Sequence, residues 1–461
     1  MVYGAVHGVK HLIHGARLAR ALPSAIACLM LFGLAIPRAQ AVPSFSRQTG
    51  ESCASCHIGA YGPQLTPFGI RFKLSGYSDT DGKGLKIPLS AMVRGSFTHT
   101  DKSQSSAAAH HFGSNNNVAL DEAVAFLAGR LAEHAGTFTQ GTYSDIDRSF
   151  SLDTTDTRYA QPLTLGGRDA ILGLAINNNP ATTNPFNRAW RVPFISSRLT
   201  PGAAASPLLR GGMGQKVMGA STYLFWNDAW YAEAGGYHSL SHDALRAMGL
   251  DDDLGRTPNV ASNWRLGYWR DWRKQNIAIG LFGLDAHLQP DRMEGPSNKY
   301  QDLGVDVSYQ LLGARRHIVT AYASYIHEHQ KRDASFDDGE SSNRNGRVDM
   351  FNINTSYVFK QTYGLELGYF DISGSHDALL YSPRPDHGSR RGSPGTSGYI
   401  LQTDWTPWGK DESWMSPWAN LRLGLQYLVY ARFNGAKHNY DGFGRDATDN
   451  NTLFFFATTS F

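Results

Sequence analysis

The chain has 461 residues, with 43 Lys and Arg against 40 Asp and Glu, which gives a formal net charge of +3. This balance is too small to indicate a nucleic-acid-binding surface, and three cysteines are too few for a disulfide scaffold. No apolar run of about 18 residues follows the first 40 positions, which argues against a mature helical membrane protein. The chain is instead rich in Gly (48), Phe (23), Tyr (21) and Trp (10), a composition typical of membrane β-barrels.

The first 41 residues have the organisation of a secretory signal peptide. Residues 10–20 carry three basic side chains, residues 21–36 are largely apolar, and residues 39–41 read A-Q-A. This order of a basic start, an apolar core and small residues predicts export and cleavage after position 41. An uncleaved anchor helix is the alternative, which the short apolar core disfavours.

Cleavage would leave two cysteines, and both lie in one motif. Residues 53–57 read C-A-S-C-H, the C-x-x-C-H pattern of c-type haem attachment. Cys53 and Cys56 would bond the two vinyl groups of one porphyrin edge, and His57 would bind the iron as proximal ligand. A redox-active disulfide and half of a zinc site are the alternatives, but a zinc site needs a second ligand pair and no further cysteine remains. We therefore predict one covalent c-type haem as the cofactor.

Residues 42–85 are predicted to form a very small helical haem segment. Thr66 suits the N-cap of a helix, Pro67 its first position, and Gly76 its end. The segment is short enough to act as a plug for the domain that follows.

Further haem contacts are predicted from residue type and position. Phe68 and Phe72 are candidates to cover the porphyrin, and Arg47 is a candidate for the haem propionates. The sixth iron ligand is predicted to be Met92 or His99, the nearest suitable side chains downstream. An open sixth position is the alternative.

From residue 86 to residue 461 the pattern changes to a period of two. In residues 303–311, L-G-V-D-V-S-Y-Q-L, every odd position is apolar and every even one small or polar. Such alternation predicts strands with one polar and one apolar face, and lipid is the natural cover for the apolar face. Sixteen strands are predicted, at 87–100, 117–133, 136–144, 150–163, 168–178, 215–226, 229–239, 263–271, 275–287, 299–311, 317–329, 347–359, 363–373, 397–407, 420–433 and 452–461.

The predicted connections alternate between short and long. Tight turns are expected at 227–228, 313–316 and 360–362, and the connections between them are long and polar. This asymmetry is typical of bacterial outer-membrane barrels, although the connection at 408–419 is too long for its side. The predicted fold is mostly β, an antiparallel outer-membrane barrel of about 16 strands with a small N-terminal haem segment. A secreted β-sandwich or propeller is the alternative.

The arrangement resembles a known family, the fused monohaem cytochrome c–porins of the outer membrane, which include iron-oxidising cytochromes. The resemblance begins around the haem motif, where residues 43–50 read P-S-F-S-R-Q-T-G and residues 65–69 read L-T-P-F-G. It continues through residues 72–77, F-K-L-S-G-Y. Weaker matches in the barrel lie at 177–180, 225–228, 433–435 and 440–443. The family often has Arg where this chain has Ile70, with Arg71 beside it.

The resemblance implies electron transfer across the outer membrane through one haem held at or in the barrel. An extracellular donor, for which Fe(II) is a candidate, would supply electrons to a periplasmic carrier such as a soluble cytochrome. The sequence leaves open whether the protein is an enzyme, an Fe(II):cytochrome c oxidoreductase, or an electron carrier alone. Two alternatives remain: a diffusion porin with a tethered haem carrier or sensor, and a conduit for a different redox mediator.

Overall fold

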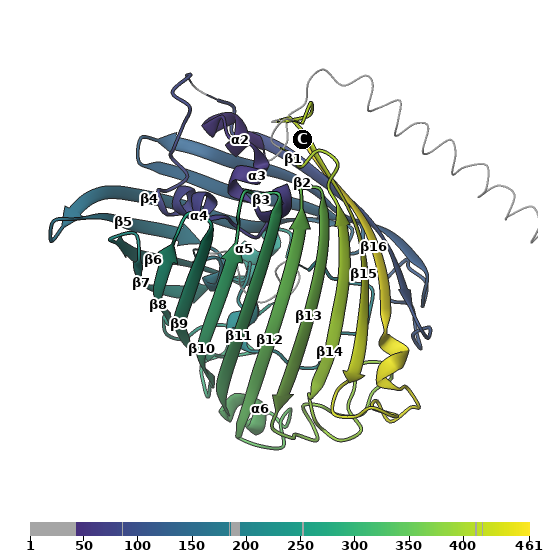
Figure 1. Ribbon diagram of the computed structural model, residues 1–461. Coiled ribbons are helices and arrows are strands. Elements are labelled where there is room, and N and C mark those ends of the chain that lie inside the picture. The colour runs from purple at the N-terminus through teal and green to yellow at the C-terminus, as the bar shows by residue number, and fades with distance from the viewer. Residues whose placement is uncertain are drawn as a thin grey trace, which may run out of the picture. The chain divides into compact units, whose positions relative to one another are not determined.

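The computed structural model describes residues 43–461, apart from residues 85, 184, 186–193, 251–252, 411–412 and 417. The predicted signal peptide lies outside the described residues. The described chain contains sixteen antiparallel strands that form one closed barrel, in which β1 pairs with β16 (Figure 1). The strands are β1 Leu89–Thr100, β2 Asn117–Ala132, β3 Ala135–Ser144, β4 Ser149–Leu165, β5 Arg168–Asn177, β6 Val217–Trp226, β7 Trp230–Ser239, β8 Ala261–Asp271, β9 Gln275–Leu288, β10 Asn298–Leu311, β11 His317–Arg332, β12 Asn345–Phe359, β13 Tyr363–Gly374, β14 Thr396–Trp405, β15 Asn420–Arg432 and β16 Thr452–Ser460. The predicted fold class and strand count are confirmed.

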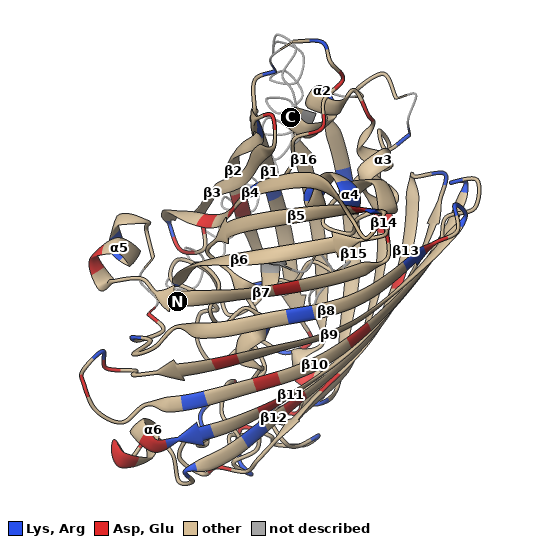
Figure 2. Cartoon of the chain, turned by 90° about the vertical axis from the view of Figure 1, so that its left-hand side faces the viewer, with Lys and Arg blue, Asp and Glu red and all other residues tan. Residues whose placement is uncertain are grey.

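The alternation seen in the sequence becomes the two faces of the wall. In β10, Leu303 and Val305 are 53% and 44% exposed on the outer face, whereas Asp302 and Asp306 are each 5% exposed on the inner face. Charged residues recur along β7 to β12 (Figure 2). A closed wall of this kind satisfies its backbone hydrogen bonds without a free edge, and its outer face is apolar.

The two ends of the barrel differ in the length of their connections. At one end the strands join through short turns such as residues 227–229 and 360–362, where both central residues of each turn have positive φ angles. Two-residue turns of this conformation match the twist of antiparallel strands. At the other end the connections are long, for example residues 375–395 and 433–451. The exception is 406–419, which is long at the short-turn end, as predicted.

Three short helices precede the barrel and lie at its short-turn end, together with the C-terminus (Figure 1). They are α2 Pro43–Thr49, α3 Cys53–Cys56 and α4 Pro67–Leu74, with the 3-10 turn η1 Ile58–Ala60 between α3 and α4. The Thr66 side chain accepts a hydrogen bond from the Gly69 amide, and Gly76 has a φ angle of +73°, so both predicted ends of this helix are confirmed. We refer to residues 43–84 as the plug segment.

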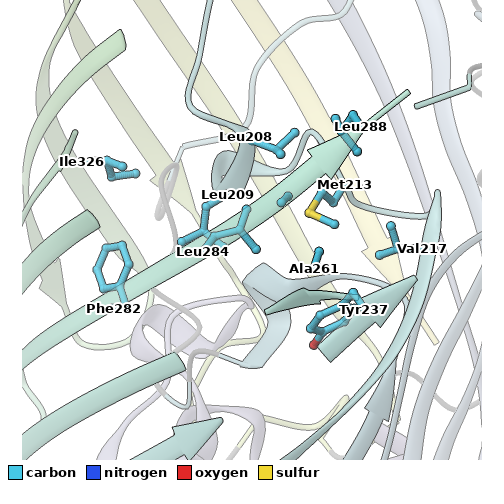
Figure 3. Packing of buried hydrophobic residues seen from close by; sticks show 11 residues of the cluster. Leu208, Leu209, Met213, Val217, Tyr237, Ala261, Phe282, Leu284, Leu288 and Ile326 are labelled. Carbon is cyan, nitrogen blue, oxygen red and sulfur yellow. The ribbon is translucent and has the colours of Figure 1, made fainter. Parts of the chain in front are cut away.

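A second segment also enters the barrel, between β5 and β6. Its 3-10 turn η3 (Leu208–Arg210) packs against inward-facing side chains of β9 and β11, including Leu284 and Ile326 (Figure 3). The amides of Leu208 and Leu209 donate to Glu328 and Asp302 of the inner wall at 2.5 and 2.7 Å. The described part of residues 178–216, which we call the inserted loop, therefore occupies the lumen.

Four further short helical elements lie along the described chain, and of these η2 reaches the cavity described below through Ala181. They are η2 Pro180–Thr183, α5 His242–Ala247, α6 Asp333–Asp337 and η4 Ala447–Asn450. No helix among the described residues is long and apolar enough to cross a membrane.

Candidate cofactor-binding site

The predicted attachment motif folds as a single helical turn. Ser52 caps α3 by accepting a hydrogen bond from the Ser55 amide at 3.3 Å, and the His57 amide donates to the Cys53 carbonyl at 2.9 Å. Cys53 and Cys56 are both free thiols, and His57 follows directly at the end of the turn. The turn brings two thiols and one imidazole to the border of the same space.

That space is a cavity of about 660 Å³ between the plug segment and the inner wall. The plug segment contributes the three motif residues, and the wall contributes residues from β1 to β4, β15 and β16. The inserted loop closes another side with Asn179, Ile195 and Arg210. The volume lies within the range of about 300–1,000 Å³ that is usual for cofactor and ligand pockets.

The His57 ring is in the state that a metal ligand requires. Burial lowers its pKa to about 4, against the smaller opposing effect of the Gln64 backbone, so the ring is neutral near pH 7. Its Nδ1 atom is buried and has no hydrogen-bond partner among the described residues. A buried, neutral imidazole beside two free thiols fits the group that the C-x-x-C-H motif implies, a covalent c-type haem.

Aromatic rings form one wall of the cavity. Phe45 packs against Phe72 with ring centroids 4.9 Å apart and stacks on Tyr77 at 5.3 Å. From the barrel wall, Phe126 and Phe138 continue the cluster with centroids 5.6 Å apart. This wall offers an apolar, water-excluding surface of the kind that a porphyrin face needs.

Positive charges also border the cavity. Arg94 pairs with Glu122 at 3.2 Å, and Arg422 pairs with Asp404 at 2.7 Å. Lys73 lies in α4, where burial is the largest of the effects that lower its pKa to about 7. These three cations are candidates to face the haem propionates.

The structure brings some predicted site residues together and separates others. Cys53, Cys56, His57, Phe72 and Met92 all line the cavity. Met92 reaches it because it lies on the inner face of β1, close to the short-turn end.

The other three predicted contacts lie elsewhere. Phe68 is 42% exposed in the first turn of α4, and Arg47 donates to the backbone oxygens of Ile87 and Leu89 at 3.2 and 2.5 Å. His99 sits on β1 at an odd-numbered position, on the side of the strand opposite to Ser96 and Thr98, and contacts Asn116 at 2.8 Å. None of the three is among the residues that line the cavity.

One group of hydrogen bonds ties the plug segment to β13, β14 and β15. Tyr61 donates to Glu366 at 2.8 Å and lies 3.1 Å from Asp404, while the Arg422 guanidinium lies 3.6 Å from the centre of the Tyr61 ring. Burial is the main cause that raises the pKa of the Tyr61 hydroxyl well above its usual value, so the hydroxyl stays protonated as a donor.

A second group ties the plug segment to β4 and β6. Tyr77 donates to Asp156 at 2.7 Å, and Asp156 also pairs with Arg158 at 2.9 Å. Tyr223 donates to the Leu74 carbonyl at 2.8 Å. With bonds to two sides of the inner wall, the plug segment is fixed within the barrel mouth.

The sequence did not single out Phe45, Tyr61, Tyr77, Phe126 or Phe138 as site residues. Phe45 and Tyr77 lie in the runs that resemble the cytochrome–porin family, which is the one signal that pointed toward them. For Phe126 and Phe138 the local pattern gives little signal. Phe126 lies in a stretch of β2 that is apolar on both faces, and Phe138 is a single aromatic among Thr, Gln and Gly in β3.

Comparison with known proteins gives similarity of structure alone. No family model matches the chain, and no curated protein matches it. The similar solved structures include OmpT of Vibrio cholerae (8% identity, 82% of this chain and 97% of that chain, TM-score 0.42). They also include an anion-selective porin from Comamonas acidovorans (11% identity, 81% and 98%, TM-score 0.44) and the channel DcaP of Acinetobacter baumannii (10% identity, 83% and 99%, TM-score 0.44). Identities and TM-scores this low carry no argument about cofactor or substrate.

Proposed function

We propose that this chain is an outer-membrane electron-transfer protein that holds one covalent c-type haem in the mouth of its barrel. The observation that carries the proposal is the meeting of Cys53, Cys56 and a buried neutral His57 at a cavity inside the barrel. The cavity volume of about 660 Å³ and the chemistry of the motif support the same group. A donor at the cell surface, for which Fe(II) is a candidate, would be linked to a periplasmic carrier such as a soluble cytochrome.

The outer face of the wall supports the membrane location. Residues such as Leu303, Val307 and Leu365 are large, apolar and 40–53% exposed on strands whose inner faces are polar. A closed barrel with this arrangement is how β-structure crosses a bilayer. In such barrels the short turns face the periplasm, which would place the plug segment on the periplasmic side.

The proposal assigns separate tasks to the residues of the site. A haem bound here would supply one-electron chemistry. Cys53 and Cys56 would hold it covalently, His57 would provide the proximal ligand, and the Phe45–Phe72 wall would exclude water. Arg94, Arg422 and Lys73 would compensate the propionate charges.

A diffusion porin with a tethered haem carrier is the second candidate, favoured by the closed barrel with its polar inner face. The two candidates differ in what passes through the lumen. The plug segment and the inserted loop both occupy it, so we expect liposomes containing the purified protein to swell no faster in small sugars than empty liposomes. Rapid swelling would favour the diffusion porin.

Reduction by Fe(II) tests the electron-transfer proposal directly. Oxidised, detergent-purified protein is mixed with Fe(II) in a stopped-flow instrument, and the haem absorbance is followed. Fast, saturable reduction is expected for an iron oxidase. Reduction by dithionite but not by Fe(II) would reject iron as the donor and leave a conduit for another mediator.

Met92 is the distal ligand that the proposal favours over His99, because only Met92 shares the cavity with His57. We expect M92L to abolish the near-infrared absorption band of methionine-bound ferric haem and to lower the reduction potential, since a thioether ligand raises it. The control is H99Q, which should leave both unchanged. An effect of H99Q with none of M92L would exclude Met92 as the ligand.

Lys73 is expected to make the haem reduction potential depend on pH. With a pKa lowered to about 7 by burial and by Arg158, its ammonium group is charged below pH 7 and neutral above it. A nearby positive charge disfavours the oxidised, more positive haem, so the potential should fall as pH rises through 7, by up to about 59 mV per pH unit. Spectroelectrochemical titration across this range should show a flatter profile for K73M, and equal slopes would contradict the expectation.

A further inference from the structure

Three consecutive short turns beside the candidate site carry five cations, and the one carboxylate that borders them is Asp271, which precedes the first turn and accepts from the Arg273 amide at 3.0 Å. They join β8 to β9, β10 to β11 and β12 to β13, and residues 272–274, 312–316 and 360–362 read W-R-K, L-G-A-R-R and K-Q-T. Together they supply five cations, which we call the basic arc: Arg273, Lys274, Arg315, Arg316 and Lys360. All except the half-buried Arg315 are exposed. Lys and Arg mark the turn ends along this edge of the barrel (Figure 2).

Hydrogen bonds between the turns make the arc continuous. The Lys274 carbonyl accepts from the amides of Leu312 and Gly313 at 2.7 and 3.0 Å, and the Lys360 amide donates to the Arg316 carbonyl at 2.7 Å. Arg316 and Lys360 both approach the Phe359 ring, at 5.8 and 5.2 Å from its centre. The five cations therefore belong to one surface.

The arc also adjoins the plug segment. Arg315 donates from Nη2 to the Ala54 carbonyl, within the turn that bears Cys53 and Cys56. The next turn reaches the same segment, because the Gln361 side chain accepts from the Gly59 amide at 3.2 Å. The surface that carries the positive charge thus borders the candidate haem site.

Other short turns at this end mix their charges. Asp169 follows Arg168, Glu133 lies close to Arg130, and Asp228 pairs with Arg71 at 3.6 Å. Net positive charge at this end is therefore concentrated on the arc rather than spread evenly around the rim. Concentrated charge of one sign steers a partner of opposite sign and orients its approach.

We propose that the basic arc is the docking surface for a soluble redox protein that presents an acidic face. The inference rests on the proposed electron-transfer function, because it names the partner of that same site. The partner would approach at the short-turn end and be oriented by the cations, with its redox centre over the turn that carries Cys53 and Cys56.

The test uses the full-length holoprotein in nanodiscs of zwitterionic lipid, with two soluble probes. Plastocyanin, a blue-copper protein with an acidic patch, is the expected binder, and basic mitochondrial-type cytochrome c is the comparison. Interferometry should show plastocyanin binding that weakens as ionic strength rises, because screening removes the attraction. The variant K274E/R316E/K360E should lose at least about tenfold in plastocyanin association rate and gain binding to cytochrome c.

The matched control is K83E/R130E/R168E, which reverses three exposed cations elsewhere at the same end and should retain binding. Equal plastocyanin binding by the arc variant, the control variant and the parent would overturn the proposal. If, in addition, the parent alone retained phosphatidylglycerol during purification, the arc would be assigned to lipid headgroups instead.

The same samples separate this inference from the proposed function. Binding is measured without electron transfer, and the C53A/C56A variant, which lacks attached haem, should bind plastocyanin like the parent. A parent haem that a neutral quinone cannot oxidise or reduce would count against electron transfer while leaving the docking result intact. Loss of docking selectivity with normal quinone reactivity would count against the arc alone.

Discussion

Replacing Cys53 and Cys56 by alanine is expected to abolish covalent haem attachment and to leave the sixteen-stranded barrel folded. Each thiol would form one of the two thioether bonds, so the double variant keeps none. Barrel stability should not depend on these thiols, because they lie on the four-residue helix α3 of the plug segment and the Cys53 thiol hydrogen-bonds to another plug residue, Ser46, at 3.7 Å. The double substitution should therefore remove all covalent haem and change the stability of the barrel little.

Haem staining after denaturing electrophoresis and intact-mass measurement report attachment, while heat-modifiable migration reports the folded barrel. The variant S55A is the control, since Ser55 lies between the two cysteines and contributes hydroxyl contacts to Ser52 and Glu51 but no thiol. It should keep the covalent haem. A C53A/C56A protein that still carried haem through denaturation would refute the assigned attachment residues.

Substituting Gly69 by alanine is expected to displace α4 from the attachment turn and to reduce the yield of haem-loaded protein severely. A Cβ atom at Gly69 would lie 2.4 Å from the Cys56 carbonyl oxygen and 3.0 Å from Leu65. The Cys56 carbonyl oxygen is a backbone atom and cannot rotate away. It also accepts a hydrogen bond from the Thr66 amide at 2.9 Å. Overpacking of this kind typically costs about 1–3 kcal/mol, here within a small segment.

Loss of the haem absorbance during thermal unfolding is the measurement, together with the ratio of haem to protein. G202A provides the control, because a Cβ atom at Gly202 meets nothing within 4 Å. We expect the haem absorbance of G69A to be lost at a lower temperature than that of G202A. Identical melting and loading of the two variants would show that α4 and the attachment turn do not need this close contact.

The sequence predicted the wall of this protein well, because the wall is encoded locally. Strands such as β10, β12, β13 and β15 show the period-two alternation, and every predicted strand end lies within three residues of the observed one. The largest shift is at β11, whose alternation continues to Arg332. Turn residues such as Asn227 and Asp228 also predicted their positions, because Asn and Asp tolerate the positive φ angles that a two-residue hairpin turn requires.

The interior was harder to predict, because it depends on residues that are distant in sequence. The inserted loop enters the lumen through contacts such as that of Leu209 with Asp302, which lie 93 positions apart. Tyr61 meets Glu366 across 305 positions. No local pattern reports such pairs, so the sequence pointed to Cys53, Cys56, His57, Phe72 and Met92 but not to the other residues that line the cavity.

The pairing of β1 with β16 has a consequence for the order of assembly. The seam can close only when the first and the last strand are both in place, yet residues 43–84 precede β1 and end up inside the mouth. Enclosing this segment as the seam forms would avoid inserting it into a finished cylinder. A cofactor bonded to the segment beforehand would be carried into the mouth with it. Covalent attachment would then keep the cofactor in place during barrel assembly, whereas a freely exchanging cofactor could be lost.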